Sequence, residues 1–161
     1  MILVACVGNI FLGDDGFGVE VARRLALKKL PMEVTVKDFG IRGFDLAYAL
    51  MESPDLTILV DACSRGYQPG TVFLLEPDPV QEGQTPAFEP HGMNPMNVLK
   101  MVKSLGGTPG RVLIVGCEPA ELGSDDDGQL GLSEPVEAAV EEAISLIESL
   151  VSKVLEGEPV V

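Results

Sequence analysis

The sequence is poor in aromatic, basic and histidine side chains, and each shortage narrows what the protein can be. It has 161 residues, no Trp and only 5% aromatic residues, so we expect a core of Val, Leu, Ile and Ala. It has 11 Lys and Arg against 25 Asp and Glu, a net charge of −14. This charge repels phosphate backbones, so we expect no nucleic-acid partner.

The cysteines and the apolar segments exclude two further classes. Cys6, Cys63 and Cys117 are odd in number, lie far apart and form no CxxC, so they are no disulfide framework. We therefore expect a reducing, cytoplasmic location. No apolar run approaches the ~20 residues of a membrane span, and the first residues lack the basic segment of a signal peptide.

Apolar runs of strand length alternate with helical patterns along the chain. The segments that we expect to be helical bury stripes spaced three and four residues apart, and Ser133 is placed to cap the last of them. The predicted strands are Ile2–Val7, Val34–Asp38, Leu56–Val60, Thr71–Leu75 and Val112–Val115. The predicted helices are Phe17–Leu30, Phe44–Met51, Asn94 or Pro95 to Leu105, and a long helix after Ser133.

This alternation predicts an α/β fold of three layers, a mainly parallel twisted sheet of about five strands with helices on both faces. Thr71–Leu75 has no helix before it, so it is expected to be the antiparallel or edge strand. We expect a single domain over residues 1–156 and a frayed tail over 157–161. Ligands of such sheets bind at the carboxyl ends of the strands, here after Val7, Asp38, Val60 and Val115.

The loop after the first strand is rich in glycine but lacks the known nucleotide-binding patterns. GxGxxG and GK[ST] are absent, and Asp14 and Asp15 would face a pyrophosphate at the helix N-terminus. We expect the glycines to allow tight backbone geometry, and the two aspartates to cap the helix that begins at Phe17. GxSxG and HExxH are absent as well, which excludes a nucleophile elbow and a zincin.

Three residues near the carboxyl edge have side chains that suit catalysis or metal binding. Asp61 directly follows a buried strand, Glu20 lies in the first turn of the first helix, and His91 is the single histidine. Together they suit a divalent ion such as Ni²⁺ or Zn²⁺. Each also has a structural alternative: a satisfied strand end for Asp61, an i,i+4 pair with Arg24 for Glu20, and ordinary surface for His91. Cys63 and Cys117 are expected to be small buried thiols.

The residues of this edge resemble a known family, the hydrogenase maturation endopeptidases that process the large subunit of nickel–iron hydrogenases. The resemblance follows the order of elements through nearly the whole chain. Its most specific part is Val7-Gly8-Asn9, Asp14-Asp15-Gly16-Phe17-Gly18 and Glu20. It continues in Val60-Asp61-Ala62, in His91 with Pro95, and in Val115-Gly116-Cys117-Glu118-Pro119.

The resemblance implies a function and a site. Family members remove a short C-terminal peptide from the large-subunit precursor after nickel has been inserted. An acidic residue of the first helix, an aspartate after a central strand and a loop histidine contact the metal, and these match Glu20, Asp61 and His91. No cofactor of its own is implied, because the nickel belongs to the precursor and serves as the recognition signal.

One segment departs from the family, and other functions stay open. Many members have a Gly-Gly segment after the second strand, where this chain has Asp38-Phe39-Gly40-Ile41-Arg42-Gly43, so a role for Asp38 is open. The alternatives are a nickel-binding chaperone or sensor that cuts nothing, and a peptidase of similar fold acting on another protein. A phosphorylated receiver domain fits poorly, because Asp14 and Asp15 begin seven residues beyond Val7.

Overall fold

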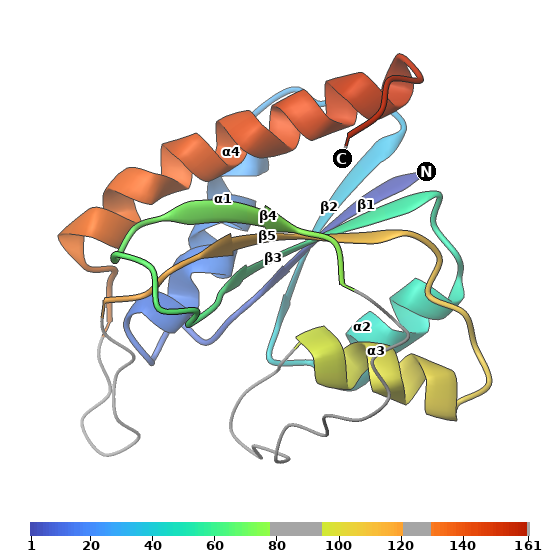
Figure 1. Ribbon diagram of the computed structural model, residues 1–161, viewed down its shortest axis with the longest axis horizontal. Helices are drawn as coiled ribbons and strands as arrows, with labels where there is room; N and C mark the ends of the chain where they lie inside the picture. The colour runs from blue at the N-terminus through green and yellow to red at the C-terminus, as the bar shows by residue number, and fades with distance from the viewer. Residues whose placement is uncertain (78–94, 121–129, 161) are drawn as a thin grey trace.

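The computed structural model describes residues 1–77, 95–120 and 130–160, and its centre is a five-stranded sheet in the order β2-β1-β3-β5-β4 (Figure 1). The strands are β1 (Ile2–Val7), β2 (Val34–Gly40), β3 (Leu56–Ala62), β4 (Val72–Leu75) and β5 (Val112–Cys117). The helices are α1 (Phe17–Leu25), α2 (Gly43–Met51), α3 (Pro95–Ser104) and α4 (Glu134–Leu155), with a short 3₁₀ turn η1 at Asp14–Gly16.

The sheet confirms the predicted class. β1, β2, β3 and β5 pair in parallel, and β4 pairs antiparallel with β5 at one edge, as expected for the strand that no helix precedes. Every residue of β1 and β5 is buried, because helices cover both faces. Parallel strands bring their carboxyl ends to one edge, which gathers the loops after β1, β2, β3 and β5 there.

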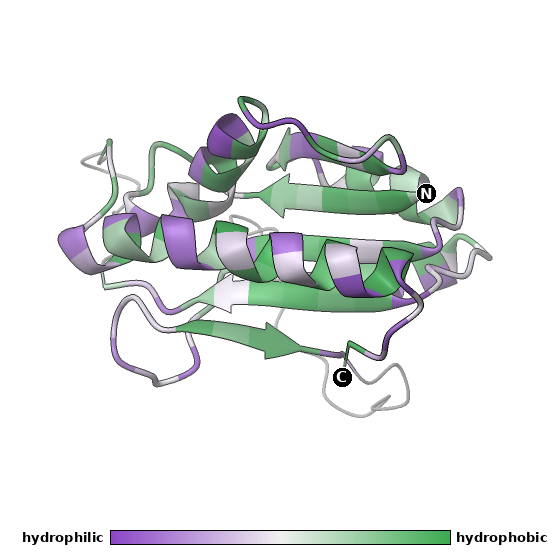
Figure 2. Cartoon of the chain, turned by 90° about the horizontal axis from the view of Figure 1, so that it is seen from above, coloured by the Kyte–Doolittle hydropathy of each residue, from purple (hydrophilic) through white to green (hydrophobic). Residues whose placement is uncertain are grey.

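Two apolar cores lie on opposite faces of the sheet. One packs α1 and α4 against side chains such as Val4, Ile58 and Val115, and the other packs α2 and α3 against neighbours such as Leu3 and Ala5. Figure 1 shows α4 above the sheet and α2 and α3 below it. The strands are mostly hydrophobic, whereas α4 alternates hydrophilic and hydrophobic bands (Figure 2). The stripes predicted for α1 and α4 are therefore confirmed.

Some element bounds differ from the sequence prediction. The first helix ends at Leu25 rather than Leu30, and its last turn tightens through i→i+3 bonds at Leu27 and Lys28. Residues 26–29 are all exposed, so no apolar face holds a longer helix. β3 and β5 run two residues further than predicted because Asp61 pairs with Gly116 and Ala62 with Cys117, which places Asp61 inside a strand.

The predicted frayed tail is also corrected where the structure describes it. After α4 the chain turns at Gly157, and Glu158 N–H donates to Lys153 O over 2.8 Å. Val160 then returns to the core that contains α4 and is only 9% exposed, so its apolar burial holds residues 157–160 in place. Among the described residues, no helix has the length and apolar character needed to span a bilayer.

Replacing Gly18 by Ala tests how closely α1 lies against the sheet. A Cβ at Gly18 would lie 2.2 Å from Val7 O and 2.6 Å from Val60 O, so β1 and β3 would both have to move. Ala normally favours a helix interior over Gly by ~0.5–1 kcal/mol, but here overpacking reverses the sign. We expect urea denaturation to show Gly18→Ala less stable by about 1–3 kcal/mol.

The matched control for this test is Ser152→Ala, an exposed position on α4. We expect its free energy of unfolding to stay within about 0.5 kcal/mol of the wild type. A Gly18→Ala protein as stable as this control would mean that α1 does not contact the strand ends.

Candidate active site at the carboxyl edge of the sheet

The loop between β1 and η1 positions Asp15 at the end of β1. The backbone N–H of Asn9 donates to Asp15 Oδ2 over 3.0 Å and also faces Asp15 O at 3.2 Å. Gly8 permits this approach, because a Cβ there would lie 2.0 Å from Asp15 O. The glycine therefore serves tight backbone geometry, as the sequence predicted.

Asp61 is the buried carboxylate of the site. It is the second-last residue of β3 and is only 5% exposed. Burial raises its pKa well above the ordinary value, and the negative charge of nearby Asp15 raises it further, while the Ala62 backbone N–H opposes both. Burial also raises the pKa of Asp15, against the opposing Asn9 N–H. Asp15 thus lies near enough to Asp61 for its charge to act on it, and we call these two carboxyl groups the acidic pair.

Asp14 has a different role from its neighbour. It is 1% exposed, and its carboxylate accepts hydrogen bonds from Ala120 N–H (2.8 Å), Ser133 N–H (2.7 Å) and the Ser133 hydroxyl (2.8 Å). It therefore joins η1 to the end of β5 and to the start of α4.

These contacts correct two predictions of helix capping. Gly16 occupies the N-cap position of α1 without a side-chain cap, so neither Asp14 nor Asp15 caps that helix. Ser133 does occupy the N-cap position of α4, but its hydroxyl donates to Asp14 and makes no cap hydrogen bond. A buried carboxylate needs donors more than the exposed helix end does, and this decides where the hydroxyl points.

Glu118 holds the loop that follows β3. It is 7% exposed, and its carboxylate accepts the backbone N–H groups of Arg65 (2.7 Å) and Gly66 (3.3 Å). The Gly70 N–H also donates to Glu118 O over 2.8 Å. The loop next to Asp61 is therefore fixed to the end of β5.

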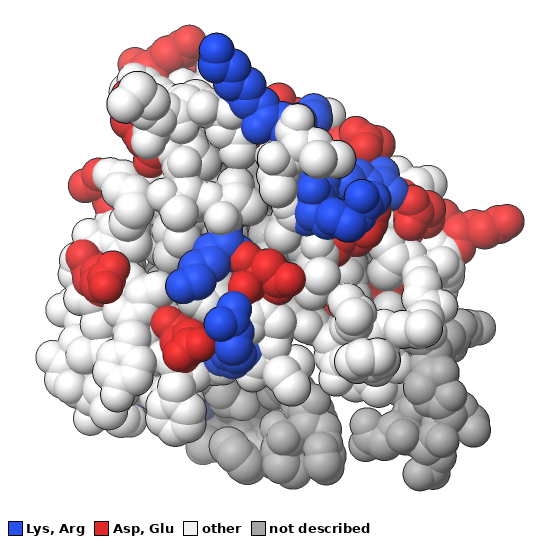
Figure 3. Space-filling model, turned by 180° about the vertical axis from the view of Figure 1, so that it is seen from behind, with Lys and Arg blue, Asp and Glu red and all other residues white. Residues whose placement is uncertain are grey.

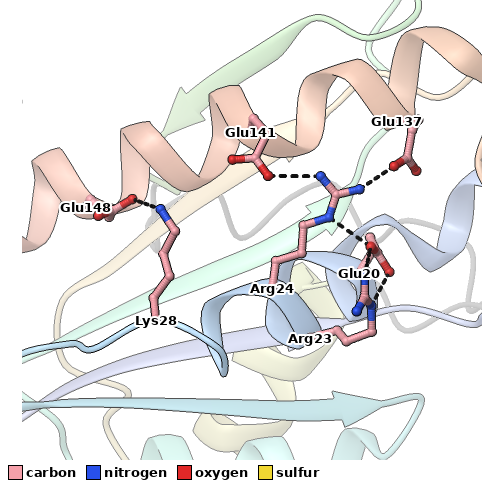
Figure 4. A network of polar contacts seen from close by, with 7 residues as sticks. All are labelled: Glu20, Arg23, Arg24, Lys28, Glu137, Glu141 and Glu148. Carbon is pink, nitrogen blue, oxygen red and sulfur yellow. Dashed lines mark hydrogen bonds and ion pairs between the residues drawn. The ribbon is translucent and has the colours of Figure 1, made fainter.

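Glu20 lies in an ion-pair network between α1 and α4 (Figure 4). Its carboxylate accepts from Arg23 at 2.7 Å and from Arg24 at 2.9 Å, and these hydrogen bonds lower its pKa to about 2. Arg24 also contacts Glu137 and Glu141 of α4. In the view of the molecule from behind, Lys and Arg side chains lie directly beside Asp and Glu side chains on the surface (Figure 3). The i,i+4 pair, the structural alternative for Glu20, is thus present.

The structure brings Asp61 together with Asp15, and engages Glu20 with arginines instead. His91 lies outside the described residues. Within residues 1–77, 95–120 and 130–160, no group of three or more His, Cys, Asp or Glu is arranged to hold a metal ion. Asp15 was missed as a site residue because helix capping explained it equally well; its place beside Asp14 in a glycine-rich loop after the first strand was the available signal.

The cysteines near this edge are poor nucleophiles. Burial and the charge of Asp61 raise the pKa of Cys63 to about 12, and burial raises that of Cys117 to about 12. Both thiols therefore stay protonated near pH 7. Both cysteines were predicted to be buried. Cys117 is fully buried, which confirms the prediction, whereas Cys63 is only half-buried.

Asp38 shapes the turn after β2. Its Oδ1 accepts the Gly40 N–H over 2.7 Å, and Arg42 donates to Asp38 O at 2.7 Å and to Phe39 O at 3.2 Å. Phe39 is fully buried beneath this turn. The side chains of Asp38 and Arg42 therefore fix this turn.

Comparison with known proteins gives one consistent result. The model of a family described as hydrogenase maturation protease matches residues 19–150. Hydrogenase 2 maturation protease of Escherichia coli K12 is 32% identical over 148 residues, which cover 91% of this chain and 87% of that protein. The structure of the hydrogenase maturating endopeptidase HybD from E. coli aligns with a TM-score of 0.77 at 30% identity, covering 97% of this chain and 93% of that one. The [NiFe] hydrogenase maturation protease HycI from Thermococcus kodakarensis KOD1 aligns with a TM-score of 0.68 at 26% identity, covering 92% and 90%.

Removing the charge of Glu20 tests the ion-pair network. Its folded pKa of about 2 lies below the ordinary value of ~4.3, so its ion pairs stabilise the fold above that value and are lost as the pH falls through about 2. We expect Glu20→Gln to lower the free energy of unfolding by about 1 kcal/mol at pH 7, since its side chain is partly exposed. The deficit should shrink below pH ~4.

Denaturation in urea at several pH values measures this difference. Glu52→Gln, at an exposed position at the end of α2, is the matched control. A Glu20→Gln deficit that does not change with pH would show that the ion pairs do not cause it.

Asp61→Asn should have the opposite effect on stability. The folded pKa of Asp61 is raised, so the native state binds its proton more tightly than the unfolded state, and stability falls as the pH rises through the ordinary value of ~3.9 and beyond. We expect Asp61→Asn to be more stable than the wild type at pH 7, and the gap to close in acid. If Asp61→Asn and the wild type were equally stable at pH 7, burying the charged form of Asp61 would cost no stability.

Proposed function

The chain belongs to the hydrogenase maturation protease family and is a peptidase of that family, so we propose that it removes the C-terminal peptide from a nickel–iron hydrogenase large-subunit precursor once nickel has been inserted. The observation that carries this proposal is the acidic pair. Two neighbouring carboxyl groups with raised pKa values, at the carboxyl edge of a parallel sheet, have the chemistry to bind a metal ion and to transfer a proton.

Nickel enters this proposal as part of the substrate. Asp61 and Asp15 supply oxygen ligands toward it, and His91 supplies the nitrogen ligand that the sequence predicts. Glu20 was predicted as the acidic ligand from the first helix. Because its carboxylate is held by Arg23 and Arg24, we assign that part to Asp15 and give Glu20 the role of fixing α1 to α4. The protein needs no cofactor of its own.

The raised pKa of Asp61 suits it to the proton transfers of peptide hydrolysis. As a carboxylate it accepts a proton from the attacking water, whose oxygen bonds to the carbonyl carbon. The C–N bond then breaks, and the same proton passes to the leaving nitrogen. The products are a new carboxylate on the mature subunit and a free amine on the released peptide. The protonated thiols of Cys63 and Cys117 take no part as nucleophiles.

The same proposal includes where the reaction takes place. All three cysteines are free, as expected in a reducing compartment, and we propose that processing occurs in the cytoplasm. The partner is the folded, nickel-loaded precursor, and the dense negative charge of this chain makes a nucleic-acid partner unfavourable.

Precursor processing tests the proposal directly. The large-subunit precursor from the same source is incubated with the protein, nickel-loaded and nickel-free in parallel, and intact mass measures the loss of the C-terminal peptide. We expect cleavage of the loaded form alone. Asp61→Asn and Asp15→Asn should slow it by about 10²-fold or more, the usual contribution of a positioned acid–base group. His91→Ala should lose cleavage as well.

Two variants serve as controls for these losses. Asp55→Asn replaces an exposed aspartate that pairs with the chain's amino group at the opposite edge of the sheet, and should cleave at the wild-type rate. Glu20→Gln should do so too. If folded Glu20→Gln failed to cleave while Asp15→Asn cleaved normally, Glu20 would be the ligand. No mass change, with Ni²⁺ bound by the protein alone, would favour the chaperone or sensor.

A further inference from the structure

Large apolar side chains are exposed on the rim of the site. They lie in the loop after β1 and at the start of α2, which follows β2. Their exposed fractions are 46% for Ile10, 60% for Phe11, 62% for Ile41, 65% for Phe44 and 58% for Tyr48. We call these five residues the rim surface. Gathered apolar exposure of this kind marks an interaction site more often than scattered single residues do.

The fold places the two segments side by side. β1 and β2 are neighbouring parallel strands, and the Gly8 N–H donates to Gly40 O over 2.9 Å where both chains leave the sheet. Ile10 and Ile41 follow this bond by one or two residues. Phe44 and Tyr48 are four residues apart on α2, so they share one face of that helix and extend the surface along it.

The rim surface is linked to the acidic pair through one residue. The backbone N–H of Asn9 holds the Asp15 carboxylate, and Asn9 Oδ1 accepts the Phe11 N–H over 2.9 Å. The same short loop therefore positions a proposed catalytic group and an exposed aromatic ring. A protein that brings a peptide bond to Asp15 therefore comes close to the exposed side chains of this loop.

We infer that the rim surface is the docking face for the folded body of the large-subunit precursor, an inference that rests on the proposed function. Charge argues against a second copy of this chain as the occupant, because two chains of net charge −14 repel each other. An apolar patch on a partner of different charge meets no such opposition. Docking here would hold the precursor while its C-terminal segment reaches Asp61.

The double variant Phe11→Ser/Phe44→Ser tests the docking face. Both side chains are exposed, so the fold should tolerate the change, which circular dichroism and urea denaturation verify. We expect KM for the nickel-loaded precursor to rise about tenfold or more, as for removal of central apolar contacts, with the effect in KM rather than kcat. Capture of the precursor by immobilised Asp61→Asn protein should weaken in parallel when the same two substitutions are added.

The chain offers a matched control away from the site. Leu27 and Met32, in the connection between α1 and β2, are 80% and 99% exposed. Leu27→Ser/Met32→Ser removes a similar amount of exposed apolar surface and should leave both KM and capture unchanged. An equal loss in this control would show that the effect is general surface chemistry and would overturn the inference.

Two further outcomes separate this inference from the proposed function. If the wild type processes the precursor and the Phe11/Phe44 variant does so with the same KM, the docking face is wrong while the function holds. If the wild type processes nothing, the function itself fails. Light scattering completes the test: a wild-type dimer that the Phe11/Phe44 variant dissociates would show that a second copy covers the surface, which also overturns the inference.

Discussion

The site depends on a close backbone approach between the first loop of the chain and the ends of β1 and β3. Gly8 leaves no room for a Cβ against Asp15 O, and Gly18 leaves none against Val7 O and Val60 O. Because the neighbouring atoms belong to the backbone, a larger residue at either position could not be accommodated by moving a side chain. These close backbone contacts bring Asp15 near Asp61, whose pKa the negative charge of Asp15 raises.

The carboxylates of this region differ in pKa and in role because different hydrogen-bond donors and charges surround them. Glu20 has two guanidinium partners and its pKa falls to about 2, whereas Asp14 is filled by two backbone N–H groups and a hydroxyl. Burial raises the pKa of Asp61, the negative charge of Asp15 raises it further, and the Ala62 N–H opposes both. A carboxylate whose acceptor sites are already occupied by donors has a structural role. A buried carboxylate with few donors for its negative charge can bind a metal ion or exchange a proton.

The sequence carries the fold more completely than the site. Buried strands such as Ile2–Val7 and the stripe of α4 follow from local apolar patterns, and so did the antiparallel edge strand. Asp61 could be predicted as a site residue because it comes directly after the apolar run Leu56–Val60. Asp15 could not be predicted in this way, since aspartate serves both as a helix cap and as a site residue. Only the tertiary contacts distinguish these two roles. The end of α1 at Leu25 could not be predicted either, because it depends on which residues pack against the core in the folded protein.

Asp61 is buried near the charge of Asp15, which opposes folding, so other interactions must hold the elements around this pair. Arg24 joins α1 to Glu137 and Glu141 of α4, and Lys28 joins Glu148 at 2.9 Å further along. These contacts, with the apolar core that packs α1 and α4 against the sheet, fix α1 without involving Asp61. These contacts offset the unfavourable charge at the strand end, and the residues that support the site are then different from those proposed to react.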